Sequence, residues 1–446
     1  MQNITVDFSQ ITGKIKPMHS VNNGPAGSKT RGTSGNFAFY EAAKIPMARN
    51  HDASFYSGYG GEHTVDVHRI FKRFERDEND PASYDFSATD KYVASCYAAG
   101  TEVFYRLGAS IEHGTKYGTY PPADFAKWAR ICEHIIRHYN EGWADGYHYG
   151  IKYWEIWNEA DCRNADGSNP CWQGTDEQFV ELFCTTIQHL KACFPELKIG
   201  GPAFCGTWND YWNELLFSEM KKRGLPLDFF SFHGYSTRPR SYTESALKAR
   251  GVMDKYGYPD AEIILNEWNY VRAWRGEEYK KSRIQSKRIK GASFIAGSMI
   301  AAEQSPMDHF MYYDARPGAW CGMFNTDTLE PLKGYYPFPM FSELYAIGGE
   351  VKSETSDDNR LYALAAKNDT EAAMMLTYFD DPDDAPAEME TTLKLVGLDG
   401  RWKLTMEVLD EEHDRAVIRE DILTGGMETI LRLPIYSVYF LRLAKI

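Results

Sequence analysis

Short apolar runs alternate with longer amphipathic stretches through most of the chain. The runs are rich in β-branched and aromatic residues and therefore predict strands. They lie at 16–21, 45–49, 102–107, 152–157, 198–201, 229–233, 262–266 and 309–312. Between several of them, apolar residues recur with helical spacing, at 122–139, 176–193 and 281–303. Thr175 stands where the second of these helices would need an N-cap.

Strands that alternate with helices predict parallel β/α units. Eight such strands within residues 15–347 predict a (β/α)8 TIM barrel with long loops. An open, doubly wound sheet is the alternative for the same alternation. That fold would favour a GxGxxG motif after the first strand, and the sequence has none there. We therefore expect a barrel as the main domain.

The pattern changes at about residue 348, where polar and apolar residues begin to alternate with a period of two and helical stretches stop. The predicted strands are 360–366, 372–379, 391–396, 401–410, 429–433 and 436–443. Strands without intervening helices predict a β-sandwich as an accessory domain over 348–446. Residues 1–14 also alternate, so we expect this N-terminal segment to join the sandwich as a further strand.

Charge and composition exclude several classes of protein. The net charge is −14, which argues against nucleic acid and against anionic membrane surfaces as partners. The first residues, MQNITVDFSQITGKIK, lack a basic region followed by an apolar run, and no stretch reaches the roughly 18 apolar residues of a membrane span. A cytoplasmic protein is therefore expected. These patterns do not encode an oligomeric state and leave a homo-oligomer open.

The eight cysteines are expected to be thiols in such a compartment, although Cys162 and Cys171 flank a short loop and could form a disulfide. Their spacing lacks the CxxC pairs of a zinc site. No phosphate-binding loop is present, because the glycine cluster at 58–61 is not followed by Lys and Ser or Thr. The sequence thus calls for no metal and no cofactor.

Two glutamates stand out at the ends of predicted barrel strands, where the active sites of such barrels lie. Glu159 follows the fourth strand, and Glu267 follows the apolar run of the seventh. Two carboxyl groups that face each other across a barrel mouth suit glycoside hydrolysis, in which one is an acid and the other a nucleophile or base. The alternative is that either glutamate forms an ion pair at the barrel rim.

Five motifs at strand ends carry a resemblance to a known family. They are KPMHSVNNGP at 16–25, RNHDAS at 49–54, YWEIWNEAD at 153–161, SFHGYS at 231–236 and ILNEWNY at 264–270. With these motifs the chain resembles glycoside hydrolase family 39, within the clan of retaining glycosidases built on (β/α)8 barrels. That family includes β-xylosidases and α-L-iduronidases. The resemblance also implies a C-terminal β-sandwich that is completed by N-terminal residues.

The resemblance implies a role for each glutamate: Glu159 is the general acid/base and Glu267 the nucleophile. An acid that keeps its proton near neutral pH needs a pKa raised by burial or by a nearby negative charge. A nucleophile has to stay ionised, and hydrogen bonds donated by His233 and Tyr235 would favour that state.

Further residues are candidates for binding the sugar. By the resemblance, Asn158 contacts the 2-hydroxyl group, and His51 and Asp52 bind hydroxyls of the terminal sugar. The alternatives are that Asn158 caps backbone groups and that Asp52 pairs with Arg49.

Aromatic residues near the last strands could stack on the face of the sugar, with burial in the core as the alternative. These residues are Trp268, Tyr312 and Trp320.

The expected function is that of a retaining, exo-acting glycoside hydrolase, foremost a β-xylosidase that acts on short oligosaccharides. The same mechanism on another glycoside is the first alternative, as in a β-glucosidase, an α-L-arabinosidase, an α-L-iduronidase or an endo-acting enzyme. A non-catalytic sugar-binding protein is the second. The pair of glutamates argues against it, because a binder needs neither two acids nor their placement.

Overall fold

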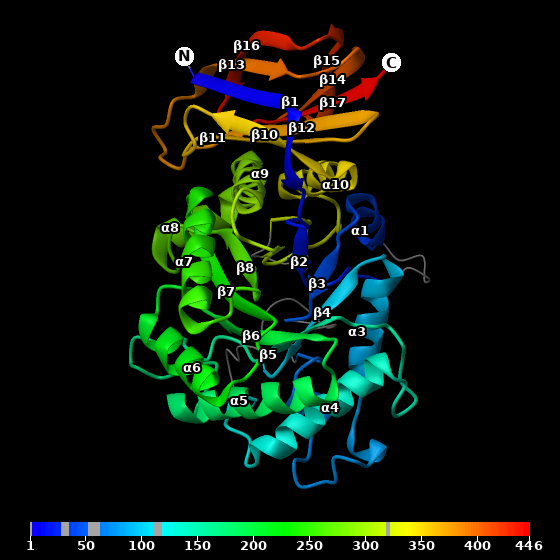
Figure 1. Ribbon diagram of the computed structural model, residues 1–446, viewed down its shortest axis with the longest axis vertical. Coiled ribbons are helices and arrows are strands. Elements are labelled where there is room, and N and C mark those ends of the chain that lie inside the picture. The colour runs from blue at the N-terminus through cyan, green and yellow to red at the C-terminus, as the bar shows by residue number, and fades with distance from the viewer. Residues whose placement is uncertain (1, 28–34, 52–62, 110–117, 318–321) are drawn as a thin grey trace.

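The computed structural model describes residues 2–27, 35–51, 63–109, 118–317 and 322–446. Eight parallel strands close into a barrel in the order β2-β3-β4-β5-β6-β7-β8-β9 (Figure 1). The strands are β2 (Ser20–Asn22), β3 (Met47–Arg49), β4 (Glu102–Leu107), β5 (Tyr153–Ile156), β6 (Lys198–Phe204), β7 (Phe229–Ser236), β8 (Glu262–Tyr270) and β9 (His309–Tyr312). The predicted barrel is confirmed.

Helices lie around the outside of the barrel (Figure 1). They are α1 (Phe37–Ala43), α2 (Val67–Ile70), α3 (Ser87–Ala98), α4 (Phe125–Asn140), α5 (Asp176–Cys193), α6 (Asp210–Arg223), α7 (Arg240–Tyr256), α8 (Gly276–Gln285), α9 (Ile289–Glu303) and α10 (Pro337–Ile347). Helix α5 begins as predicted at Thr175, whose hydroxyl accepts a hydrogen bond from the Gln178 amide, while the Gln178 side chain caps Thr175 in return. Among the described residues, no helix has both the length and the apolar character that a bilayer crossing requires.

The helix predicted over 281–303 is two helices, α8 and α9, which differ in their surroundings. Every residue of α9 is buried, because the helix lies between the barrel strand β8 and the accessory sheet strands that follow. Only one residue of α8, Ser282, is buried. A single straight helix would not be exposed over its first half and buried over its second half in this way, and the chain bends at 286–288.

Nine strands form the accessory domain, in the order β15-β14-β17-β12-β11-β10-β1-β13-β16. Their bounds are β1 (Gln2–Lys14), β10 (Gly349–Thr355), β11 (Leu361–Lys367), β12 (Glu371–Tyr378), β13 (Glu388–Val396), β14 (Arg401–Leu409), β15 (Asp414–Thr424), β16 (Met427–Pro434) and β17 (Val438–Lys445). The N-terminal strand β1 lies inside this sheet, antiparallel to β10 and parallel to β13. The predicted C-terminal β-domain with an N-terminal strand is confirmed, and its strands are hydrogen-bonded into one continuous sheet.

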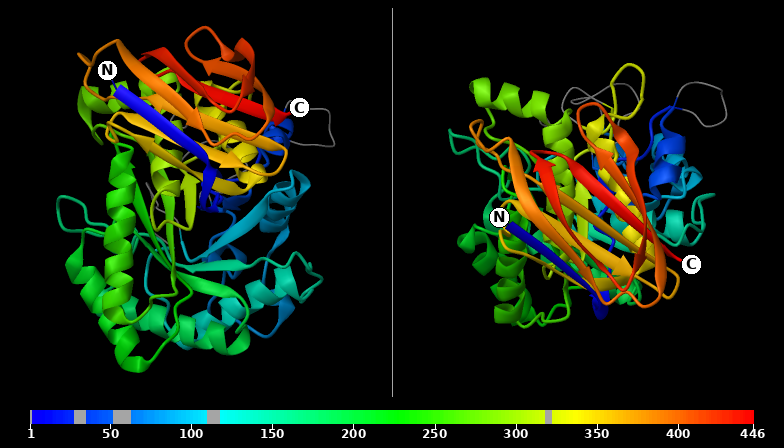
Figure 2. Two further views of the ribbon diagram at one scale, coloured as in Figure 1. Left: turned by 45° about the horizontal axis from the view of Figure 1, so that its top comes forward. Right: turned by 90° about the horizontal axis from the view of Figure 1, so that it is seen from above.

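The sheet curls around a core of its own (Figure 2). Side chains from both halves of the sheet, such as Val6, Trp402 and Leu433, form one buried cluster. The opposite faces of β11, β12 and β17 pack on α9 and α10, so that Leu364 and Met375 belong to the same apolar cluster as the barrel helices. Barrel and sheet therefore share a continuous apolar interface.

Strands β10 and β15 were not predicted from the sequence. Both are polar: β10 reads GEVKSET with one fully buried residue, Val351, and β15 reads DRAVIREDILT with mostly exposed side chains. Strand β15 forms one edge of the sheet. A strand that is held by its backbone pairing and not by burial gives little period-two signal in the sequence.

Candidate active site

The barrel interior is built in layers that follow the period of two along each strand. The lowest layer is apolar and consists of Met47, Phe104, Tyr153, Phe229, Ile264 and Met311. Two positions further along the same strands the inward side chains are polar, namely Arg49, Glu155, Ser231 and Asn266, and all of them are fully buried. Further along the same strands or directly after them, His51, Glu159, His233 and Glu267 lie at the mouth of the barrel.

At the mouth, these residues line a cleft of about 930 Å³. Glu159, His233 and Glu267 share its floor with His51 and Tyr235. Two exposed aromatic residues, Trp208 and Trp274, line it further out. The volume is within the range of small-molecule sites, which run from about 300 to 1,000 Å³. The cleft therefore has room for a ligand of one to a few sugar rings.

Irregular backbone aims both glutamates into the cleft. Trp157 and Glu159 have φ angles of 73° and 48°, in the left-handed region that costs energy for residues with a side chain. The Glu159 amide is held by a 2.9 Å hydrogen bond to the Ala203 carbonyl. On β8, a register shift relative to β7 pairs Phe232 with Leu265 but His233 with Glu267. This β-bulge lets adjacent residues Asn266 and Glu267 both join the interior network.

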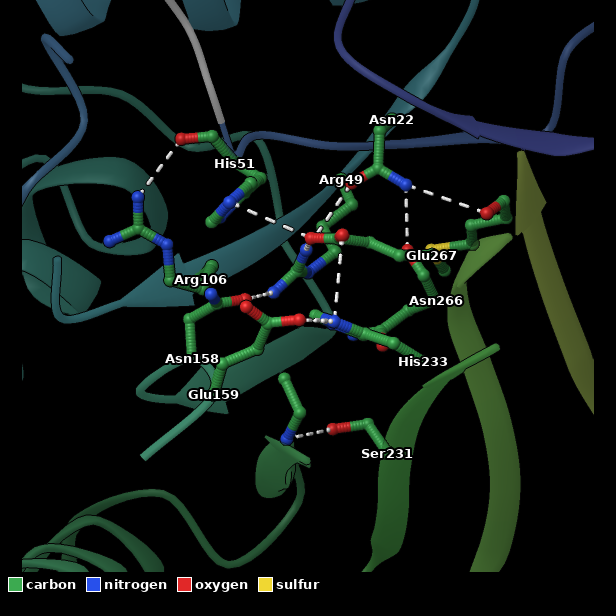
Figure 3. A network of polar contacts seen from close by, with 12 residues as sticks. Asn22, Arg49, His51, Arg106, Asn158, Glu159, Ser231, His233, Asn266 and Glu267 are labelled. Carbon is green, nitrogen blue, oxygen red and sulfur yellow. Dashed lines mark hydrogen bonds and ion pairs between the residues drawn. The ribbon is translucent and has the colours of Figure 1, made fainter. Parts of the chain in front are cut away.

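The two glutamates lie close together. A carboxylate oxygen of Glu159, a carboxylate oxygen of Glu267 and a ring nitrogen of His233 are all within 4.8 Å of one another. His233 stands between the acids, with Nδ1 2.7 Å from Glu159 Oε1 and 3.5 Å from Glu267 Oε2 (Figure 3). Burial lowers the pKa of His233 to about 4, so the imidazole is neutral near pH 7.

Glu267 is surrounded by groups that stabilise its charge. The Arg49 guanidinium donates to Oε1 at 2.8 Å, and the Tyr235 hydroxyl donates to Oε2 at 2.8 Å. His51 Nε2 lies 3.6 Å from Oε1. Burial raises the pKa of Glu267, and His233, Arg49 and the Tyr235 hydroxyl act in the opposite direction.

Arg49 connects the polar residues beneath the cleft (Figure 3). Its Nε donates to Glu155 at 2.7 Å, and its remaining nitrogens donate to Glu267 and, at 2.7 Å, to Asn158 Oδ1. Glu155 also accepts from Ser231 at 2.6 Å and from Asn266. Arg49 and its partners are almost wholly shielded from solvent, so each charge depends on this pairing. The network fixes Glu267 and orients the Asn158 amide group.

Glu159 has the opposite environment. Burial, followed by the neighbouring Cys162, raises the pKa of Glu159 to about 8, against the influence of Arg49. Cys171 Sγ lies 3.8 Å from Glu159 Oε2, and Cys162 and Cys205 line the cleft beside it. Hydrogen bonds from Cys171 and Cys205 lower the pKa of the Cys162 thiol. The carboxyl group of Glu159 therefore keeps its proton at neutral pH.

The structure gathers most of the sequence-predicted residues at one place. Glu159, Glu267, His51, His233 and Tyr235 line the cleft, and Asn158 lies beneath it in contact with Arg49. Asp52 and Trp320 lie outside the described residues.

The prediction that Tyr312 and Trp268 stack on a sugar is corrected. Both are fully buried and face the surrounding helices; Trp268 stacks on Phe310, and the Tyr312 ring packs against Phe338. The neighbouring residue Tyr313 lines the cleft instead. One step along a strand moves a side chain to the opposite face, which explains the error.

Sequence reasoning missed the buried network. Arg49 was considered only as a partner for Asp52, and Glu155 was not considered at all. A signal was present, because Arg49 and Glu155 each follow an inward apolar residue by two positions within an apolar strand. Trp208 and Trp274 were missed because they lie on loops, for which no periodicity predicts orientation.

Fold and site together define a class. A closed (β/α)8 barrel with two glutamates at its mouth, one after its fourth strand and one on its seventh, is the combination that the strand-end motifs predict for glycoside hydrolase family 39. Residues 62–260 match the model of the Glycosyl hydrolases family 39. The resemblance to glycoside hydrolase family 39 that the strand-end motifs carry is thereby confirmed.

Known relatives point the same way. The chain is 27% identical to a β-xylosidase of Geobacillus stearothermophilus over 233 residues, which are 45% of this chain and 44% of that protein. A β-xylosidase of Caldicellulosiruptor saccharolyticus is 26% identical over 193 residues, or 40% of this chain and 36% of that one. The matched part thus spans less than half of the length of either relative.

Solved structures show the same fold over the whole chain. A glucosidase from Croceicoccus marinus has a TM-score of 0.81 at 21% identity, with 100% of this chain and 99% of that chain covered. A monomeric β-xylosidase from Caulobacter crescentus CB15 has a TM-score of 0.72 at 16% identity, with both chains fully covered at 100%.

Proposed function

We propose that this protein is a retaining, exo-acting glycoside hydrolase that releases terminal xylose from short β-linked oligosaccharides. The proximity of Glu159 and Glu267 carries this proposal, since one oxygen of each lies within 4.8 Å of the other. Retaining enzymes hold their two carboxyl groups about 5–5.5 Å apart, whereas inverting enzymes leave about 6.5–9.5 Å for a water molecule. The observed spacing favours direct attack by a carboxylate over attack by an interposed water.

In the first step, Glu159 transfers its proton to the glycosidic oxygen while Glu267 attacks the anomeric carbon. The bond from that carbon to the leaving oxygen breaks, and an ester to Glu267 forms. In the second step, water attacks the same carbon, gives its proton to the Glu159 carboxylate and releases Glu267. Two inversions at one carbon retain its configuration.

The electrostatics of the site support this division of roles. Burial and Cys162 keep Glu159 protonated, as a general acid has to be. Arg49 and Tyr235 hydrogen-bond to Glu267 and stabilise its carboxylate, as a nucleophile requires. A negative charge on Glu159 raises the pKa of Glu267. By the same repulsion, esterification of Glu267 favours ionisation of Glu159, which can then act as a base.

Neutral His233 stands between both acids and is proposed to position them and the sugar. The Asn158 oxygen accepts a hydrogen bond from Arg49, which leaves its amide NH2 group as a donor, and we assign that group to the sugar 2-hydroxyl. His51 is proposed to bind a hydroxyl next to Glu267.

Xylose is proposed as the sugar because both curated relatives are β-xylosidases. We propose a cytoplasmic location, where the described cysteines would remain free thiols.

A panel of aryl glycosides tests the proposal with wild type, Glu159→Ala and Glu267→Ala, each with and without azide. We expect cleavage of the β-xyloside, rescue of Glu159→Ala as the β-azide and rescue of Glu267→Ala as the α-azide. Glu303→Gln is the matched control, because Glu303 is also buried but binds the Lys16 amide away from the cleft. A first product of inverted configuration from the wild type would refute the double displacement.

A further inference from the structure

Three cysteines surround the Glu159 carboxyl group. Cys162 follows it by three residues, Cys171 lies on the same loop, and Cys205 directly follows β6. Cys162 and Cys205 line the cleft, while Cys171 is fully buried. All three are free thiols. The proposed mechanism requires a proton on Glu159 but assigns no task to a cluster of thiols around it.

The ligand atoms of this cluster converge. A carboxylate oxygen of Glu159 and the sulfur atoms of Cys162 and Cys205 all lie within 4.8 Å of one another. Cys171 Sγ is 3.8 Å from the second oxygen of Glu159. In a tetrahedral zinc site, bonds of about 2.3 Å to sulfur and about 2.0–2.2 Å to oxygen bring ligand atoms to similar mutual distances.

The backbone that carries these ligands is fixed. Cys205 N donates to both oxygens of Asp161, at 2.9 and 3.2 Å. Glu159 N donates to Ala203 O at 2.9 Å, and Cys162 N donates to Glu159 O at 3.0 Å. The loops after β5 and β6 are thus bonded to each other. Preorganised ligands favour metal binding, because little conformational freedom remains to be lost.

We propose that Glu159, Cys162 and Cys205 form a binding site for a thiophilic divalent cation of the zinc class, open to the cleft. Two sulfur ligands select such a cation over Mg²⁺ or Ca²⁺, which bind oxygen. The fourth position faces the cleft and is filled by water. Binding releases the protons of the ligating groups to the buffer. The spacing of Cys162 and Cys171 gave no hint of this site, because Cys205 comes from a different strand.

The cation would inhibit the enzyme, and this consequence rests on the proposed function. A Glu159 carboxylate that is bound to a metal ion has no proton to give to a leaving group. Inhibition is therefore reversible by a chelator and does not alter the protein covalently. Cation binding itself is independent of the reaction, so the two ideas can fail separately.

Within the described part of the chain, two other groups of side chains compete as sites. Glu133, His189 and Cys193 come together on helices α4 and α5, and Glu159, His233 and Glu267 come together in the cleft. The first offers one sulfur and the second none. Thiolate-to-metal charge transfer therefore excludes the second group, and the variant Cys193→Ser, which removes the sulfur of the first group, separates that group from the proposed site.

The experiment is a Cd²⁺ titration of the full chain, kept reduced by a phosphine, with ultraviolet absorption and calorimetry as readouts. We expect one site with sulfur-to-cadmium absorption in wild type and Cys193→Ser. In Cys205→Ser the affinity should fall more than about 100-fold, since even outer-shell changes at metal sites cost about 10–100-fold. Circular dichroism of each variant shows that it is folded, and Cys162→Ser provides the second test should Cys205→Ser misfold.

Absence of sulfur-to-cadmium absorption in the wild type would overturn the site, as would an affinity lost in Cys193→Ser but kept in Cys205→Ser. In the activity arm, Zn²⁺ should inhibit wild type and Cys193→Ser, with recovery on addition of a chelator. Should the chain bind Cd²⁺ as described and cleave no glycoside, the metal site stands and the proposed function falls.

Discussion

Alkaline pH should switch off the first chemical step by removing the proton from Glu159. Burial and Cys162 raise the pKa of this carboxyl group from its ordinary value of 4.5 to about 8. The acid is active when protonated, so activity is present below that pKa and lost as pH rises through it. The profile of kcat/KM against pH reports the groups of the free enzyme. Its basic limb should therefore have a midpoint near 8.

The size of the effect follows from the fraction of enzyme that is still protonated. One pH unit above the pKa, about a tenth of Glu159 carries its proton, and two units above it, about a hundredth. We expect kcat/KM on a β-xyloside with a poor leaving group to fall about 10-fold per pH unit on this limb. Glu159→Gln, assayed with an activated leaving group that needs no acid, should show no basic limb.

Glu303 provides the control for this assay. Burial raises its pKa to about 8 as well, but it lies on α9 and binds the Lys16 amide. Glu303→Gln should keep the basic limb of the wild type. A limb near pH 8 that persists in Glu159→Gln and disappears in Glu303→Gln would refute our assignment, because it would trace the loss of activity to unfolding and not to the acid.

Three further predictions concern the surroundings of the two acids. Tyr235→Phe removes a hydrogen bond to ionised Glu267, so the pKa of Glu267 should rise. The acidic limb of the profile of kcat/KM against pH should then move to higher pH, and an unchanged limb would contradict this prediction. Arg49→Met removes the cationic partner of two buried carboxylates, Glu155 and Glu267, and should lower the free energy of unfolding measured in urea by about 3–5 kcal/mol. The partly exposed ion pair of Arg163 with Asp176 is the comparison, since Arg163→Met should lower the free energy of unfolding by less than about 1 kcal/mol. Trp274→Ala should raise KM for xylotriose about 2- to 10-fold but not for an aryl xyloside, if this exposed ring carries the second sugar.

The sequence predicted the bounds of strands and helices best where the pattern of apolar residues matches the side chains that are buried in the structure. The strands at 102–107 and 309–312 and the helix at 176–193 have the predicted bounds, because apolar periodicity and end signals coincide there. Glu159 and Glu267 were found because acids at the ends of apolar strands are costly unless used. The bulge at Asn266 was not found, since a one-residue register shift leaves no trace in composition.

Contacts between residues that are far apart in the sequence could not be predicted from the local pattern of apolar and polar residues. Arg49 contacts Glu155 and Glu267, 106 and 218 positions away, and only closure of the barrel brings them together. The thiol cluster has the same origin, because Cys162 and Cys205 are contributed by neighbouring strands. Tyr312 was assigned to the cleft because the sequence does not show which face of a short strand without polar and apolar alternation turns inward.

The position of β1 inside the accessory sheet has a consequence for how the molecule folds. Asn3 is hydrogen-bonded to Ser356, 353 positions later, and β1 also pairs with β13. Synthesis from the N-terminus therefore produces this strand before the barrel but supplies its two neighbours only after the barrel. Until then β1 has two unpaired edges, and every native contact of the sheet waits for the barrel sequence to be complete. Contacts of such high sequence separation form slowly, so closure of the sheet around β1 should be the late step of folding. Once the sheet has formed, the pairing of β1 with β10 holds the segment before the barrel next to the segment after it.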